Sequence, residues 1–230
     1  MLFWDIDGTL LTTARAGIAA WEQAVLDCTG VTRTLENFPT AGLTDHEIAE
    51  ALMNSVPSDR RAPLEQIVAR YETLLPECLP SRVGSVLPGV RDILESVRHR
   101  QDVRSMLLTG NTANGARAKL AHYGLIEYFE AGGAFSSHGA SRPAIARAAL
   151  RMARALLGDG TPLDPVVIGD TPADIRCGNA IGARVIAVAT GSYALPALRA
   201  ARPWWSTPRL PDPEMFLARL GVPGAGPATQ

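Results

Sequence analysis

Three short apolar runs, each ending abruptly at a hydroxyl or carboxylate side chain, constrain the fold of this chain more than any other feature of its sequence. Runs of this length and composition, separated by helical patterns, are typical of parallel strands that are covered on both faces. In an open parallel sheet the ligand site lies beyond the carboxyl ends of the strands, so we expect the residues that follow the runs to lie close together. The runs are Leu2 to Trp4 before Asp5, Val103 to Leu108 before Thr109, and Val166 to Ile168 before Gly169-Asp170.

Helical patterns occupy the segments between these runs, and a fourth, β-branched run from Val185 to Val188 continues the alternation. This order predicts an α/β fold with a Rossmann-like three-layer core, in which a parallel sheet lies between two layers of helices. The expected helices are 90–97 after Pro88-Gly89, 112–123 ending at Gly124, 143–156 capped by Ser141, and one from Pro172 to near Gly182.

Residues 13–87 interrupt the alternation. This stretch has helical patterns at 14–28, 45–53 and 64–75 but no convincing buried strand. Thr44 and Glu47 have the spacing of a capping box, which places a helix start at Asp45. We therefore expect a small helical cap domain at 13–87, over the mouth of the site. The catalytic core would comprise 1–12 and 88–220, and 221–230 would form a flexible tail.

The composition indicates a protein that acts on small molecules. The chain has 230 residues and a formal net charge of −1, which is enough for a large buried core but gives no excess of basic residues for nucleic-acid or anionic-membrane binding. No apolar run reaches the roughly 18 residues of a membrane-spanning helix, and no basic segment precedes the first motif. We therefore expect a cytoplasmic monomer or homodimer, with neither nucleic acid nor a membrane as partner.

Three motifs in fixed order resemble a known family. They are Asp5-Ile6-Asp7-Gly8-Thr9, Thr109-Gly110-Asn111, and Gly169-Asp170-Thr171-Pro172-Ala173-Asp174, with the helical insertion after the first. The set resembles the haloacid dehalogenase-like superfamily and, more closely, its phosphoglycolate phosphatase-like branch with a helical cap. The resemblance extends from Asp5 to about Thr190. It implies a Mg²⁺-dependent phosphatase that cleaves small soluble phosphate monoesters through an aspartyl-phosphate, with phosphoglycolate-like compounds among the candidate substrates.

The resemblance implies a role for each carboxylate of the first motif. Asp5 would be the nucleophile. Asp7, two residues on in an extended segment, would protonate the leaving group and later deprotonate the attacking water. An Asp-x-Asp-Gly stretch can also be an ordinary turn with side-chain caps, an alternative that the other two motifs weaken.

Magnesium is the cofactor that the resemblance implies, because hard oxygen ligands suit this ion and neighbouring carboxylates repel unless they share a cation. The implied ligands are Asp5, the main-chain carbonyl of Asp7, and Asp170. Asp174 would hold a ligand water or orient another ligand. Its alternative role is that of an acidic residue in the first turn of a helix.

Phosphate binding is implied for Thr109, with the backbone N–H of Gly110 and with Gly8 and Asn111 nearby. Thr109 could equally cap the helix that follows. Family members usually carry a lysine, sometimes an arginine, between this threonine and the Gly-Asp motif. Arg142 stands at that place and would pair with Asp5 and the phosphoryl group. Lys119, the only lysine, lies too early in the order.

Other activities are less compatible with these residues. A phosphonate hydrolase needs a cap lysine, which 13–87 lacks, and a haloacid dehalogenase needs neither a second aspartate nor a metal. A sugar-phosphate mutase shares every core residue and remains an alternative. A non-catalytic protein that binds phosphorylated metabolites is the second.

Overall fold

The computed structural model describes residues 1–35, 38–158 and 160–222. Most of the predicted tail, from residue 223 on, therefore lies outside the described residues. Among those that are described, no helix combines the length and apolar character needed to cross a membrane.

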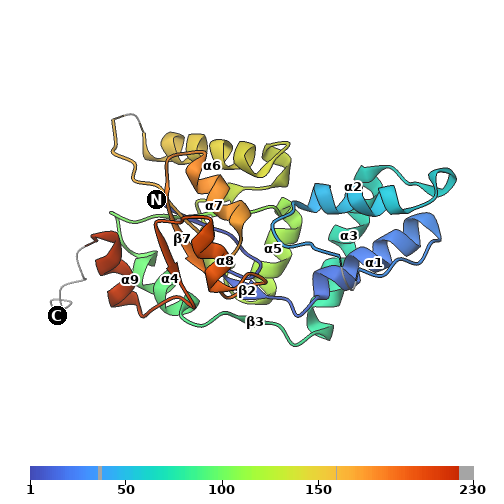
Figure 1. The fold of residues 1–230 in the computed structure, drawn as a ribbon, viewed down its shortest axis with the longest axis horizontal. Helices are drawn as coiled ribbons and strands as arrows, with labels where there is room; N and C mark the ends of the chain where they lie inside the picture. Colours follow the sequence, from blue (N-terminus) through green and yellow to red (C-terminus); the bar gives the residue numbers. More distant parts are fainter. Residues whose placement is uncertain (36–37, 159, 223–230) are drawn as a thin grey trace.

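A six-stranded parallel sheet forms the centre of the molecule (Figure 1). Its strand order is β5-β4-β1-β6-β7-β8. The four predicted runs form the four inner strands, and the two edge strands are additions that the sequence did not indicate. The strands are β1 Leu2–Trp4, β4 Ser105–Leu108, β5 Gly133–Ala134, β6 Val166–Gly169, β7 Arg184–Val188 and β8 Trp205–Thr207.

Helices cover both faces of the sheet, which confirms the predicted α/β, Rossmann-like class. Alternation along β1 shows the layers, because Leu2 and Trp4 pack in one apolar cluster and Phe3 packs in the other. One layer contains α4 Val90–Arg98, α5 Ala113–His122 and α9 Pro213–Leu220; the other contains α6 Arg142–Leu157, α7 Pro172–Asn179 and α8 Leu195–Ala200.

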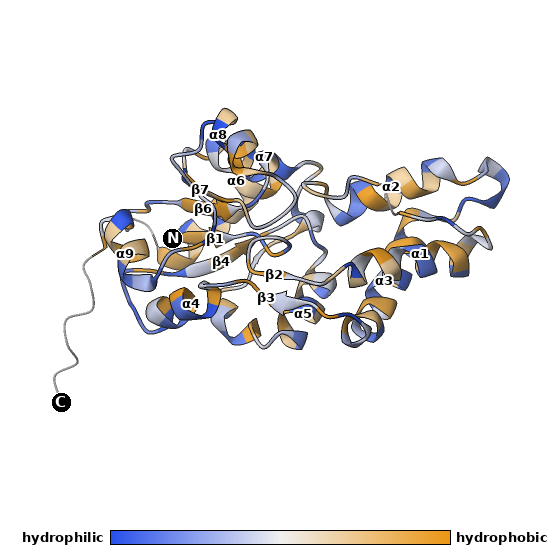
Figure 2. Cartoon of the chain, turned by 60° about the horizontal axis from the view of Figure 1, so that its bottom comes forward, coloured by the Kyte–Doolittle hydropathy of each residue, from blue (hydrophilic) through white to orange (hydrophobic). Residues whose placement is uncertain are grey.

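The inserted segment forms a helical lobe beside the core, with its own buried apolar cluster (Figures 1 and 2). Its helices are α1 Ala16–Thr29, α2 Asp45–Ser55 and α3 Leu64–Cys78. Trp21 of α1 stacks on Tyr71 of α3 with ring centroids 3.9 Å apart. The predicted capping box is present, since Thr44 accepts from the Glu47 N–H and the Glu47 side chain accepts from the Thr44 N–H.

The chain enters and leaves this lobe through a short antiparallel ribbon. β2 Leu11–Thr12 pairs with β3 Ser85–Val86. The expectation of no buried strand within 13–87 still holds for this ribbon, because Ser85 is exposed and Val86 is only half-buried. A strand of two residues is also too short to show a pattern in the sequence. Directly after β2, Ala14 and Arg15 have φ values of 46° and 70°, which turn the chain into α1.

Two smaller expectations about α6 and α7 need correction. The side chain of Ser141 makes no capping hydrogen bond, and α6 begins at Arg142, one residue earlier than expected. α7 ends at Asn179. Four short 3-10 turns connect the longer elements: η1 Ser58–Arg60, η2 Leu79–Ser81, η3 Ile126–Phe129 and η4 Ser136–His138.

Candidate active site

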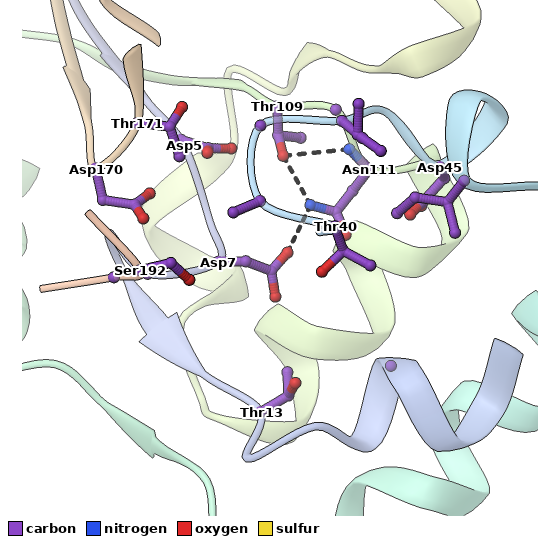
Figure 3. A pocket seen from close by; sticks show the side chains of 18 of the residues that line it. Asp5, Asp7, Thr13, Thr40, Asp45, Thr109, Asn111, Asp170, Thr171 and Ser192 are labelled. Atoms are coloured by element: carbon purple, nitrogen blue, oxygen red, sulfur yellow. Dashed lines mark hydrogen bonds between the residues drawn. The ribbon is translucent and has the colours of Figure 1, made fainter. Parts of the chain in front are cut away.

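The three polar strand ends meet at one edge of the sheet. Trp4 of β1 is in register with Leu107 of β4 and with Ile168 of β6, so the residues that follow these strands lie side by side. They open into a cavity of about 460 Å³ between the sheet and the helical insert (Figure 3). The cavity is lined by every predicted site residue except Asp174, namely Asp5, Asp7, Gly8, Thr109, Gly110, Asn111, Arg142 and Asp170.

Asp5 lies directly after β1 and is buried. Its backbone N–H donates to the Ile168 carbonyl at 3.0 Å, which ties it to β6. Burial, followed by the negative charge of Asp174, raises the pKa of Asp5 to about 6, against the opposing effect of Arg142. The carboxylate is therefore costly to ionise until further positive charge comes near it.

Three buried carboxylates, those of Asp5, Asp170 and Asp174, place oxygen atoms within 4.8 Å of one another. Burial and the other two carboxylates raise the pKa of Asp170 well above its usual value. A compact group of hard oxygen donors, whose negative charge Arg142 offsets only in part, fits the chemistry of Mg²⁺. The expected ligands Asp5 and Asp170 both belong to this group, together with Asp174, which was expected to hold a ligand water or to orient another ligand.

The backbone is shaped closely around Asp170. A Cβ atom on Gly191 would lie 1.7 Å from Oδ2 of Asp170, and one on Gly8, whose φ is 78°, would lie 2.4 Å from the same oxygen. Thr9 donates its hydroxyl to Oδ1 at 3.2 Å, and Thr190 donates to the Gly8 carbonyl at 2.6 Å. Only glycines permit this approach, so the contacts fix the position of the carboxylate. Gly191 follows the run from Val185 to Val188, which ends at Thr190-Gly191, but no motif indicated its close approach to Asp170.

Arg142, the first residue of α6, is buried between two of the carboxylates. Its Nη2 atom contacts Oδ2 of Asp5 at 3.3 Å and also forms an ion pair with Asp174. The contact with Asp5 is the one expected from the sequence. The contact with Asp174 is additional, and it combines with the capping box in which Asp174 accepts from the backbone N–H and hydroxyl of Thr171. Asp174 thus acts as a helix-capping residue while remaining within reach of the carboxylate group.

The carboxylate of Asp7 points away from the three buried carboxylates and toward Asn111. Figure 3 shows Asn111 between Thr109 and Asp7, and its side-chain amide donates to Thr109 Oγ1 at 2.8 Å and to Asp7 Oδ2 at 2.9 Å. The cap of α5 is Thr112, which accepts from the Gly115 N–H at 3.0 Å. Thr109 is therefore not the helix cap, and its hydroxyl remains beside the cavity.

Lys119 is a site residue that the order of the motifs had ruled out. Its ammonium donates to Asp7 Oδ2 and to Asn111 Oδ1, each at 2.6 Å. Side chains on a helix lean toward its N-terminus, and eight residues are close to two full turns, so a lysine eight positions after Asn111 returns to the motif. This spacing, together with the rarity of lysine in the chain, was the available signal.

Asp45 connects the helical insert to the core. Its backbone N–H donates to the Gly110 carbonyl at 2.8 Å, and its Oδ2 atom accepts from the Thr112 N–H at 2.7 Å. Burial raises the pKa of Asp45 to about 6, although nearby Lys119 lowers it. No sequence pattern pairs Asp45 with residues more than sixty positions away, so this contact could not be predicted.

The sequence pattern of the haloacid dehalogenase-like hydrolase family matches residues 2–179. The chain belongs to this family. The match includes all three motifs and the helical insertion between the first and second. No curated protein matched the chain significantly.

Solved structures support the same fold. A predicted phosphoglycolate phosphatase from Haemophilus somnus is similar with a TM-score of 0.69 and 15% identity, covering 96% of this chain and 97% of the other. A protein provisionally described as a beta-phosphoglucomutase from Thermotoga maritima has a TM-score of 0.60 and 21% identity, with 96% and 97% covered. CbbY from Rhodobacter sphaeroides, solved with phosphate, has a TM-score of 0.61 and 19% identity, with 84% and 86% covered. At these identities the likeness establishes the fold.

Proposed function

We propose that this hydrolase is a Mg²⁺-dependent phosphatase that cleaves small phosphate monoesters through an aspartyl-phosphate on Asp5. The observation that supports the proposal most directly is the grouping of Asp5, Asp170 and Arg142 at the inner end of one cavity, with Asp7 beside them. A phosphoryl transfer site needs a fixed nucleophile, positive charge for the phosphoryl oxygens and an acid for the leaving group.

The first half of the reaction would use Asp5 and Asp7. A carboxylate oxygen of Asp5 attacks phosphorus, the bond to the leaving-group oxygen breaks, and Asp7 donates a proton to that oxygen. In the second half Asp7 removes a proton from water, which attacks the same phosphorus and releases Asp5 and inorganic phosphate. The Thr109 hydroxyl and the Gly110 N–H would hold the phosphoryl oxygens during both halves.

The residues that would hold Mg²⁺ are Asp5, Asp170 and the carbonyl of Asp7, with Asp174 close by. Bound there, the ion would neutralise negative charge on the carboxylates and on the phosphoryl oxygens. Arg142 supplies a fixed cation beside Asp5 and orients that side chain through their contact.

The cavity wall opposite the carboxylates comes from the insert, and it would surround the leaving group. Its larger side chains are mostly apolar, which suits a small organic alcohol. Arg15 is the cation that the insert adds to the described lining, and it would be the partner for the carboxylate of a phosphoglycolate-like substrate. The larger insert residues of the lining are Arg15, Ile18, Trp21, Phe38, Leu43, Ile48 and Tyr71.

A sugar-phosphate mutase on the same core is the second candidate, because the likeness to the Thermotoga maritima structure covers nearly the whole of both chains. A mutase would have to return the phosphoryl group from Asp5 to a retained sugar, whereas a phosphatase delivers it to water. The distinction lies in the fate of the aspartyl-phosphate.

Product analysis tests the proposal. The purified protein is incubated with Mg²⁺ and a panel of phosphorylated metabolites that includes phosphoglycolate, simple alkyl phosphates and hexose phosphates. Release of inorganic phosphate, with ¹⁸O from labelled water in the product, supports the phosphatase. An isomerised sugar phosphate without phosphate release would establish the mutase, and binding without either product would establish a non-catalytic phosphometabolite-binding protein.

A further inference from the structure

The side chain of Lys119 is buried within the core, at 6% exposure, and its ammonium contacts Asp7. Burial alone disfavours a charged ammonium, and the carboxylates of Asp7 and Asp45 offset this effect. An apolar side chain at this position of α5 would pack without that cost. The buried ammonium is therefore stabilised by the charges of Asp7 and Asp45 and by its hydrogen bond to Asn111.

The two carboxylate oxygens of Asp7 differ in their hydrogen bonds. Oδ2 accepts from both Lys119 and Asn111, at 2.6 and 2.9 Å. Among the described residues, no side chain donates to Oδ1, and the Asp7 side chain is 45% exposed at the wall of the cavity. One oxygen is thus held while the other faces the space where a leaving group would lie.

We propose that Lys119 is a positioning residue for Asp7: it fixes the carboxylate so that Oδ1 can exchange a proton with the leaving-group oxygen. This inference rests on the proposed phosphatase function. Under this proposal the two buried cations of the site serve different carboxylates, because Arg142 contacts Asp5 and Lys119 contacts Asp7. Asn111, which binds both Lys119 and Asp7, completes the arrangement.

Substrates with different leaving groups can distinguish a positioning role for Lys119 from a purely structural one. An alkyl phosphate needs a proton on its departing oxygen, whereas p-nitrophenolate leaves readily without one. The ratio kcat/KM covers steps up to loss of the leaving group. For Lys119→Met, we expect kcat/KM to fall about 100-fold or more with an alkyl phosphate but less than about 5-fold with p-nitrophenyl phosphate.

The comparison is made within each protein preparation, so a partly unfolded sample changes both values equally and leaves their ratio intact. Lys119→Arg keeps a cation with several donors. It should partly restore the ratio of kcat/KM for the alkyl phosphate to kcat/KM for p-nitrophenyl phosphate. Arg117→Met is the matched control, because this exposed residue lies on the same helix and the change removes the same charge. Its ratio should equal that of the wild type.

A double-mutant cycle isolates the route through Asp7. Once Asp7→Ala has removed the carboxylate, adding Lys119→Met should lower kcat/KM for the alkyl phosphate by less than about 3-fold. An unchanged ratio in Lys119→Met and Lys119→Gln, or full additivity in the cycle, would overturn the proposal. Absence of phosphate release by the wild type with Mg²⁺ would instead overturn the proposed function on which it rests.

Discussion

At the scale of single residues, each carboxylate assigned to the chemistry has a buried cation beside it. Asp5 contacts Arg142, and Asp7 contacts Lys119. The first pairing follows from the order of motifs in the sequence, where an arginine stands in place of the more common lysine. The second pairing was missed because Lys119 lies outside the three motifs and reaches Asp7 only through its position on α5.

Asp5→Asn is expected to lower turnover by several orders of magnitude with the fold preserved. An amide is a poor nucleophile, yet it has nearly the same shape and removes one of three mutually repelling carboxylates. Phosphate release measured beside circular dichroism checks this, with Asp92→Asn on the exposed side of α4 as the control. A folded Asp5→Asn variant with near-normal activity would contradict the mechanism.

Arg142→Ala is expected to reduce turnover about 100-fold or more and to destabilise the protein by about 3 kcal/mol, because it leaves Asp5 and Asp174 buried without their cation. Arg142→Lys should restore part of both losses. Steady-state kinetics and urea unfolding measure the two effects. Arg147→Ala, an exposed change on the same helix, should alter neither; a silent Arg142→Ala would mean that another residue serves as the cation.

At the scale of elements, the start of α2 joins the insert to the core through Asp45. The carboxyl group of Asp45 has a pKa of about 6, above the ordinary value of 3.8 that applies when the chain unfolds. Between these values the folded protein binds more protons than the unfolded chain, so the free energy of unfolding falls as the pH rises from about 4 to about 6. A shift of this size corresponds to roughly 3 kcal/mol.

Asp45→Asn should remove this contribution while keeping an oxygen that accepts from the Thr112 N–H. Its free energy of unfolding, relative to wild type, should therefore increase by up to about 3 kcal/mol as the pH rises from 4 to 7. Urea unfolding at several pH values measures the difference between the two proteins, which separates Asp45 from Asp5 and the other carboxylates. A difference that stays constant with pH would contradict the prediction.

The elements also show where sequence patterns fail. Strands β1, β4, β6 and β7 could be predicted because each is a run of buried apolar residues in the middle of the sheet. Strand β5 consists of Gly133 and Ala134, which have no β propensity, and β8 begins within the Trp204-Trp205 pair at an exposed edge. Both are strands because a neighbouring strand pairs with them, which no local pattern encodes.

At the scale of the whole molecule, the site depends on carboxylates that follow β1 and β6 and lie together, where the proposed Mg²⁺ would bind. Chelation is expected to abolish activity, Mg²⁺ to restore it, and Ca²⁺ to fail because its looser and larger coordination misplaces the nucleophile. Mg²⁺ should also raise the melting temperature of the wild type, since it offsets repulsion among the three carboxylates.

Asp170→Ala is the control for this effect, and its melting temperature should respond little to Mg²⁺. Thermal unfolding at increasing Mg²⁺ concentration makes the comparison without reference to activity. Full activity in excess EDTA would contradict the metal assignment. An equal rise in melting temperature with Mg²⁺ in both proteins would mean that the ion does not bind at Asp170.

The ribbon of β2 and β3 brings the two ends of the insert together. Thr12 and Ser85 are paired across the ribbon, so the chain leaves the core and returns to it at adjacent points. A two-residue turn such as Asn-Gly is the shortest link that could close these strands into a hairpin. A different insert could thus be joined at the same two points without changing the order of the strands in the sheet. In such exchanges the groups that react with phosphate would stay with the core, while the wall that selects the alcohol would travel with the insert.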